Sequence, residues 1–363
     1  MTKFAKISLV AAVAVTSLSA VDFSGYATYR FDNAANVDSN VYKAALTAKQ
    51  KVSDDFTAAV GVSVRSEDTV STLGASDDNG NDTVSMNAIN FTYTGIKNLT
   101  VVAGRQALNT PWTEGSSVID KTQQGNGVLG LYNAGFATIA AGHFTNNNIT
   151  VDANTALNVK DSDLNVVAAI VPLPAIDATA QAWYITVGEA GSVASDTNAA
   201  SYNLAGKVSG VSYDARYSTL KLNSGTTLGG TATLAKIVAS TNIAGIDFTA
   251  GYGKTGKNGG GVVAFDNDGD ASFGVEIANL NGLADTKATL LGAAYNVLPN
   301  VNASLSYLNI SGQGTANDAN EIDAALTYTA SKNMTAKIVY ANLTADVKAD
   351  DEDLTRIELA YKF

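Results

Sequence analysis

The feature that most constrains this chain is a period-two alternation of apolar and polar residues, repeated over segments of roughly ten residues. In "DFTAAVGVSVR", apolar side chains take every second position from Phe56 to Val64, whereas Ser63 and Arg65 take the other parity. Alternation of this kind predicts a strand with one apolar and one polar face. No segment carries a sustained helical apolar stripe, so we predict an all-β fold.

The connections between these segments are of two kinds, and the two kinds alternate along the chain. Short connections lie at 53–55, 95–98, 133–135, 209–210, 244–245 and 331–333. Long polar connections lie at 66–83, 108–126, 145–161, 255–285 and 345–352. Short turns at one rim and long loops at the other are typical of a transmembrane antiparallel β-barrel with short periplasmic turns and longer extracellular loops. We expect about 18 strands, with about 16 as the alternative, because residues 271–285 fit either a strand or a loop.

The N-terminal segment "MTKFAKISLVAAVAVTSLSA" begins with two lysines, continues with an apolar run and ends with small residues. This pattern predicts a secretory signal peptide over residues 1–20, followed by one barrel domain over residues 21–363. The chain has no cysteine, so an exported form has no disulfides to stabilise it. Its formal charge is −11, and loss of Lys3 and Lys6 with the signal peptide makes the mature chain −13. Such an acidic exported protein is a poor partner for nucleic acid.

The chain ends on "RIELAYKF", in which the apolar positions all share the parity of the last residue. These positions are Ile357, Leu359, Tyr361 and Phe363. A terminal strand of this form resembles the signal that the outer-membrane barrel assembly machinery reads. The strand must also pair with the first one, because an open sheet edge in lipid leaves unpaired amides.

Four stretches carry a resemblance to a known family: "VDFSGYATYRFDN" at 21–33, "VVAGRQALNTPWTEG" at 101–115, "VSYDARYS" at 211–218 and "ELAYKF" at the end. Together they resemble the major outer membrane porins of Campylobacter-type bacteria, barrels of the OprD-like or general-porin type. The resemblance implies a porin of the Gram-negative outer membrane with about 18 strands. It also implies a homotrimer that passes small hydrophilic solutes.

The connection from about Asn109 to Asn126 is the third one on the long-loop rim, the position at which trimeric porins fold a loop into the lumen. We therefore expect it to form the pore constriction, with Glu114, Asp120 and Lys121 at the narrow point. The alternative is that these residues lie outside on a surface loop. The opposite wall would present the basic residues of inward parity, which are Arg30, Lys43, Arg65, Lys207 and Arg216. Acid facing base would set a transverse field across the gap.

Other candidate sites are weak. The "GYGKTG" at 251–256 matches a dinucleotide fingerprint by letter, but the following "KNGGG" cannot start the helix that holds a pyrophosphate. Alternate aspartates in "FDNDGD", namely Asp266, Asp268 and Asp270, could bind Ca²⁺ weakly, although a solvated loop is the simpler interpretation. The single histidine, His143, has no nucleophile motif beside it. We predict no enzyme and no cofactor other than this possible Ca²⁺.

The function predicted from the sequence is a water-filled channel for passive diffusion of ions and small hydrophilic solutes. Acidic residues concentrate in the loops at 66–83 and 345–352, so we expect weak cation selectivity. The alternative is an adhesin or receptor barrel that only displays loops. Expected partners are outer-membrane lipid, lipopolysaccharide and the assembly machinery.

Overall fold

A computed structural model describes residues 21–35, 37–69, 83–113, 123–147, 149, 162–188, 197–222, 229–265, 269–312, 318–347 and 351–363, without the side chains of 67–69 and 83. The segment predicted to be a signal peptide, residues 1–20, lies outside these ranges. In the described ranges, eighteen strands form one sheet. The strands are β1 (Asp22–Ala34), β2 (Val37–Lys51), β3 (Phe56–Thr69), β4 (Thr83–Ile96), β5 (Leu99–Ala107), β6 (Gln124–Asn133), β7 (Thr138–Asn147), β8 (Leu164–Leu173), β9 (Ala178–Val187), β10 (Thr197–Val208), β11 (Val211–Leu222), β12 (Gly230–Ile243), β13 (Ile246–Thr255), β14 (Lys287–Leu298), β15 (Val301–Ser311), β16 (Ala319–Ser331), β17 (Met334–Ala345) and β18 (Glu352–Lys362).

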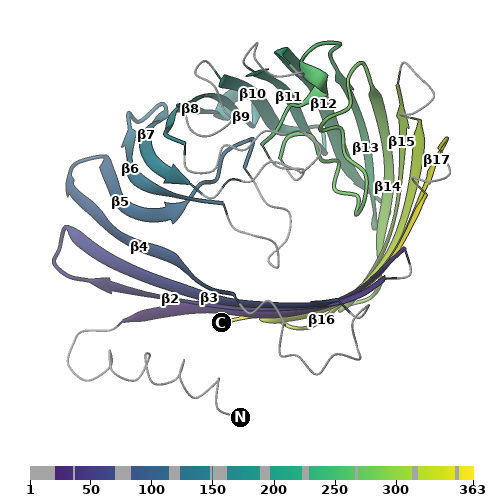
Figure 1. Ribbon diagram of the computed structural model, residues 1–363, viewed down its shortest axis with the longest axis horizontal. Coiled ribbons are helices and arrows are strands. Elements are labelled where there is room, and N and C mark those ends of the chain that lie inside the picture. Colours follow the sequence, from purple (N-terminus) through teal and green to yellow (C-terminus); the bar gives the residue numbers. More distant parts are fainter. Residues whose placement is uncertain are drawn as a thin grey trace.

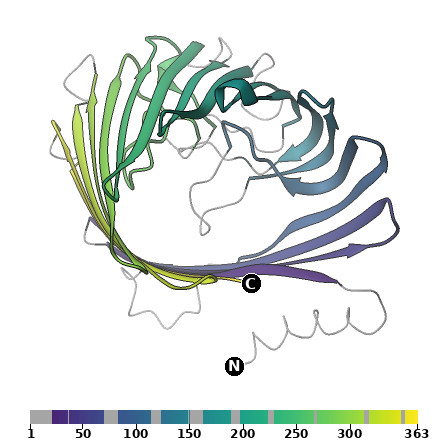
Figure 2. The same cartoon turned by 180° about the vertical axis from the view of Figure 1, so that it is seen from behind.

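The sheet closes on itself as a ring. Each strand pairs antiparallel with the next, and β1 also pairs with β18 in a register that sets Tyr26 opposite Lys362. The first strands (purple) and the last (yellow) accordingly lie together in both views of the ring (Figures 1 and 2). The 18-strand prediction is confirmed. Residues 271–285 form a loop containing one isolated bridge, between Ser272 and Asn279, and no strand.

Two of the predicted short connections, 209–210 and 244–245, are tight turns between neighbouring strands. At 209–210 and 244–245 both central residues have positive φ, 49° and 85° in the first turn and 53° and 87° in the second. Positive φ at both positions defines a type I′ turn, which suits glycine second and matches the twist of a hairpin. A 3₁₀ turn over Pro174–Ile176 joins β8 to β9, and residues 299–300 join β14 to β15. Pro172 is the penultimate residue of β8.

The alternation of faces predicted from the sequence is present in the strands. On β3, Phe56 and Val60 are 44% and 48% exposed, whereas Ser63 is buried at 9%. Large exposed apolar side chains recur around the ring, among them Phe91, Tyr217, Leu291, Leu305 and Tyr340. The exterior is therefore apolar, and the buried polar groups lie on the inner face. No helix in the described part of the chain is long and apolar enough to cross a membrane.

Two helical turns of 3₁₀ type complete the described structure, over Pro174–Ile176 and Gly259–Gly261. The second begins the long connection from β13 to β14, residues 256–286. Most of that connection is described, and it lies inside the ring. We call it the β13–β14 loop.

Candidate functional site

The β13–β14 loop is fixed to the inner wall at three places. The first involves Asp270, whose side chain is fully buried. Its carboxylate pairs with the Arg216 guanidinium on β11 and accepts hydrogen bonds from Ser218 and, at 2.9 Å, from Ser201 on β10. Arg216 also pairs with Asp214 at 2.7 Å, so this cation is held between a wall acid and a loop acid.

The second anchor is Glu276, on the opposite part of the wall. One carboxylate oxygen accepts a hydrogen bond of 2.8 Å from Lys337 on β17, and the other pairs with Arg356 on β18. Arg356 in turn contacts Asp32 on β1 at 2.7 Å, and Arg30 contacts the same carboxylate at 2.9 Å. The loop thus joins a chain of alternating charges that crosses the β18–β1 seam.

The third anchor uses the loop backbone. The N–H groups of Ile277 and Ala278 donate to the two oxygens of Glu321 at 2.8 and 2.6 Å. The N–H of Glu276 donates to Asp323 at 3.1 Å. Glu321 and Asp323 are buried on β16, where carboxylates need such donors to offset the loss of water. Successive N–H groups aimed at one carboxylate fix the conformation of the loop tip.

Between these anchors the loop packs on an apolar patch of the inner wall. The wall contributes small and aliphatic side chains, namely Ala232, Leu234, Ala288, Leu290, Leu308 and Ile310. The loop contributes Val263, Ala264, Ala271, Phe273 and Leu280. These side chains are buried at 7% exposure or less, so the loop covers this side of the lumen as a packed layer.

Phe273 explains the glycines of the "GYGKTG" stretch. A Cβ built on Gly253 would lie 2.7 Å from Cζ of Phe273, and one on Gly251 would lie 3.2 Å from its ring. Lys236 sits over the same ring at 5.4 Å and donates to the Ser272 carbonyl at 2.8 Å. The glycines make room for an aromatic ring of the loop, and β13 runs directly into a glycine-rich segment.

The connection from β5 to β6 also enters the ring in its described part. Trp112 is fully buried, and its ring centroid lies 6.5 Å from that of Phe265 in the β13–β14 loop. The backbone of the two loops is joined by Phe265 N–H to Trp112 O at 3.2 Å and Asp270 N–H to Pro111 O at 2.9 Å. Both loops then pack on apolar residues of β7–β11, including Phe144, Ile185 and Leu220.

The predicted constriction residues Glu114, Asp120 and Lys121 lie outside the described residues. In the described residues, the charged contacts between a loop and the inner wall are made by the β13–β14 loop, with Asp270 and Glu276 as its acids. Sequence reasoning did not identify this loop as lumenal. The sequence feature that could have indicated a lumenal position is the apolar run Val262–Phe265, which lies inside a connection that was predicted to be polar and external.

Register places all five predicted wall cations on the inner face. Lys43 pairs across strands with Thr28 and Arg65, and Arg216 pairs with Lys236. Lys43 also lies over the Tyr26 ring at 5.7 Å. Of the five, Lys207 is exposed beside the 209–210 turn, away from the loop anchors.

The remaining candidates do not join this site. Asp266 and Asp268 lie outside the described residues, and Asp270 is engaged by Arg216. The described part of the chain holds no group of three His, Cys, Asp or Glu side chains suited to a metal ion. His143 shares the outward parity of Val128 and bonds Asn165 Oδ1 at 2.8 Å through Nδ1.

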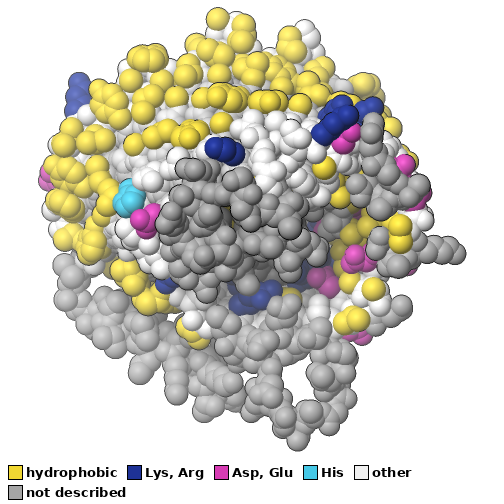
Figure 3. All heavy atoms as spheres, turned by 45° about the horizontal axis from the view of Figure 1, so that its top comes forward, with side chains coloured by type: hydrophobic (Ala, Val, Ile, Leu, Met, Phe, Trp, Pro, Cys, Tyr) yellow, Lys and Arg dark blue, Asp and Glu magenta, His cyan; other side chains and the backbone are white. Residues whose placement is uncertain are grey.

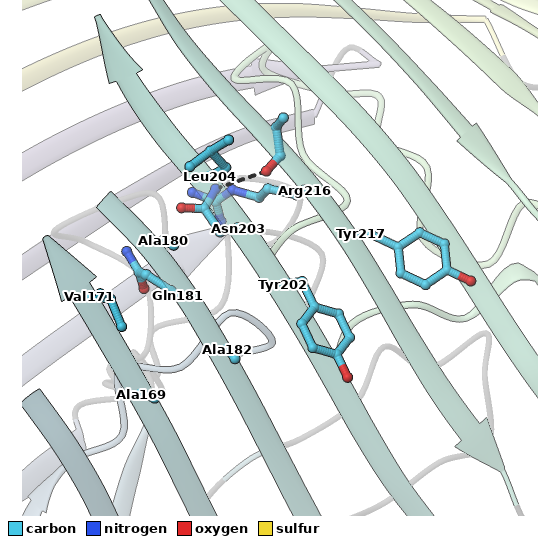
Figure 4. Close-up of a pocket in the computed structure, with 11 residues that line it drawn as sticks. Ala169, Val171, Ala180, Gln181, Ala182, Tyr202, Asn203, Leu204, Arg216 and Tyr217 are labelled. Carbon is cyan, nitrogen blue, oxygen red and sulfur yellow. Dashed lines mark hydrogen bonds between the residues drawn. The ribbon is translucent and has the colours of Figure 1, made fainter. Parts of the chain in front are cut away.

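A shallow groove lies on the outer face over β8–β11 and belongs to the exterior. Figure 4 shows the rings of Tyr202 and Tyr217 standing beside the small side chains Ala169 and Ala182 that floor it. Tyr202 and Tyr217 are paired across strands and are 54% and 47% exposed. Arg216 also lines this groove, and the inward parity of Arg216 directs its guanidinium to the inner face of the sheet, where it pairs with Asp270.

Solved structures share this architecture. Pseudomonas aeruginosa OccK5 (OpdH) superposes with a TM-score of 0.76 at 12% identity, covering 94% of this chain and 97% of that one. This chain has the fold of a porin. The P. aeruginosa outer membrane protein OpdK gives 0.75 at 12% identity over 96% and 100% of the two chains. A BenF-like porin from Pseudomonas fluorescens Pf-5 gives 0.73 at 14% over 94% and 98%. No protein-family model and no curated protein matches the sequence.

Proposed function

We propose that this chain is an outer-membrane porin of a Gram-negative bacterium, a channel for passive diffusion of ions and small hydrophilic solutes. The observation that carries this is that the side chains are placed in the reverse of the order usual in a soluble protein. Apolar side chains cover the outside of a closed barrel, and a charged loop is held by ion pairs on its inside. Only lipid suits such an exterior, and only hydrated solutes suit such an interior. The solved neighbours include a BenF-like porin and an outer membrane protein, OpdK, which supports this proposal.

We propose weak cation selectivity for this channel. The described charges at the β13–β14 loop largely pair with one another: Asp270 with Arg216, and Glu276 with Lys337 and Arg356. Because these loop acids are paired with wall cations, we assign the selectivity to the long-loop rim, where the sequence concentrates its excess acid. Acidic mouths concentrate cations over about a Debye length, roughly 8 Å at physiological salt.

Planar-bilayer recording of the purified protein tests both statements. We expect stepwise conductance and a reversal potential under a KCl gradient that shows K⁺ preference, decreasing as salt rises. No conductance would contradict the channel and favour the adhesin or receptor alternative. Chloride preference would contradict only the selectivity.

We also propose the finer affiliation, membership of the Campylobacter-type major outer membrane porins, with a homotrimeric assembly. The stretch "GRQALNTPW" supports it, because it runs from β5 to the buried Trp112 that joins the two lumenal loops. Chemical cross-linking in intact outer membranes would test the trimer, and a ladder ending at the monomer would contradict it.

A further inference from the structure

Charged side chains on the outer face are segregated by sign near the long-loop rim. Parity places Lys221 on β11, Lys254 on β13 and Lys287 on β14 outward, and all three are exposed. On the other side of the ring, the outward charges among the described side chains are Asp38 on β2 and Asp353 on β18. The basic sector, Lys221, Lys254 and Lys287, thus covers β11–β14.

Two of these lysines face each other directly. Lys254 and Lys287 are register partners on β13 and β14, so their side chains stand next to each other on one face. Like charges directly opposite are destabilising unless something neutralises them. Among the described residues, no acidic side chain forms an ion pair with either one, and the nearby Asp285 contacts Lys257 at 3.7 Å. The acids of the opposite sector differ from these lysines because each has a hydrogen-bond partner: Asp38 accepts from Asn33, and Asp353 accepts from Asn342.

The lysines stand just beyond the apolar exterior. On β13 the outward residue two positions before Lys254 is Tyr252, which is 45% exposed, and on β14 the outward Leu291 is 56% exposed. Two residues along a strand span about 7 Å. Figure 3 shows this side, with basic side chains (dark blue) along the margin of the apolar band (yellow). In an outer-membrane barrel, side chains just beyond the apolar band would lie near the lipid head groups.

We propose that Lys221, Lys254 and Lys287 bind the phosphate groups of the phosphorylated glycolipid of the outer leaflet. Its acyl chains then lie against Tyr252 and Leu291. A phosphorylated amphiphile supplies the anion that the Lys254–Lys287 pair lacks and the hydrocarbon that the apolar band requires. This inference rests on the proposed outer-membrane location and not on the channel's selectivity.

A second copy of the chain fits this surface less well. In a closed trimer of round barrels, the two contact faces of one barrel lie about 60° apart, or roughly three of eighteen strands. The basic and acidic sectors are centred six or seven strands apart around the ring, near β12–β13 and β1. A trimer contact therefore cannot bring them together, and a two-fold contact would set lysine against lysine.

Native mass spectrometry of the detergent-solubilised protein tests the site. The probes are bisphosphorylated lipid A, the same lipid A after phosphatase treatment, and phosphatidylglycerol. The test variant is Lys254→Gln with Lys287→Gln. The control is Lys97→Gln with Lys332→Gln, which removes the same charge from exposed turns on the opposite rim. We expect the test variant to lose on the order of 20-fold in affinity for lipid A, about fivefold per lysine.

The control should bind as the wild type does, and dephosphorylated lipid A should bind both variants equally. Inorganic phosphate at the lipid concentration should leave the lipid A complex intact. Equal loss in both variants, or equal affinity for phosphatidylglycerol, would overturn the proposal. Unchanged conductance would show that the test variant folds. If the double variant does not fold, the single substitution Lys287→Gln takes its place in the binding experiment. If the wild-type protein shows no conductance, only the porin proposal is contradicted, because lipid binding is measured independently by native mass spectrometry.

Discussion

The ring of Phe363 lies over the backbone of Gly25, and the two residues exchange backbone hydrogen bonds of 2.9 and 3.0 Å across the seam of the barrel. A Cβ built on Gly25 would lie 2.6 Å from Cζ of Phe363, so the first strand offers a space that the last side chain fills. The ring also stacks on Tyr361 at 5.9 Å between centroids. The last residue is therefore part of the closure itself.

Replacing Phe363 by Asp should prevent assembly in the membrane. The change removes the aromatic from the seam, puts a charge on the lipid-facing parity and alters the assembly signal expected from the sequence. Cell fractionation with immunoblotting measures it, and we expect the variant to accumulate in the periplasm. Phe363→Tyr is the control and should assemble. Normal outer-membrane levels of the Asp variant would contradict this role.

The alternation of faces predicts opposite results for two neighbouring residues. Val62 has the outward parity and pairs with Leu46 and Met86, so Val62→Arg should cost about 2–4 kcal/mol near the membrane midplane. Ser63 points inward and donates a 2.7 Å hydrogen bond to Asn87, so Ser63→Arg should alter conductance while the barrel still forms. Urea unfolding in lipid vesicles and bilayer recording separate the two effects. Equal damage from both would mean that the assigned register is wrong.

The extent of successful prediction follows from the range of the interactions. Strand faces and turns such as Ser209–Gly210 depend on neighbours in sequence, and they were predicted correctly. The loop position was not, because the pairing of Asp270 with Arg216 joins residues 54 positions apart, and that of Arg356 with Glu276 joins residues 80 apart. An acid in a long connection has the same local sequence whether it faces solvent or a buried arginine.

Substituting Gly253 should displace the β13–β14 loop. In Gly253→Val the new side chain would overlap Phe273 Cζ at 2.7 Å and approach Leu280 Cδ1 at 3.2 Å, and overpacking of this kind costs about 1–3 kcal/mol. We expect higher and noisier single-channel conductance. Adding Phe273→Ala should restore the wild-type trace by removing the clash. Gly292→Val is the matched control, because the nearest atom to its Cβ is 3.6 Å away, and it should change little.

Neutralising Glu276 should shift selectivity toward anions. Glu276→Gln removes the carboxylate that pairs with Lys337 and Arg356, which leaves two wall cations facing the lumen with one acid fewer. A unit charge about 8 Å from an ion in water contributes about 0.5 kcal/mol, and screening over one Debye length reduces this to about 0.2 kcal/mol. Because the charge acts with opposite sign on K⁺ and Cl⁻, the K⁺/Cl⁻ permeability ratio should fall by about twofold. Reversal potentials under a KCl gradient measure this ratio. The control is Asp54→Asn on the short-turn rim, where the exposed Asp54 carboxylate accepts a hydrogen bond from Lys51 that lowers its pKa. If the control shifts the ratio as much as Glu276→Gln, selectivity depends on total charge, and the loop anchor has no special part in it.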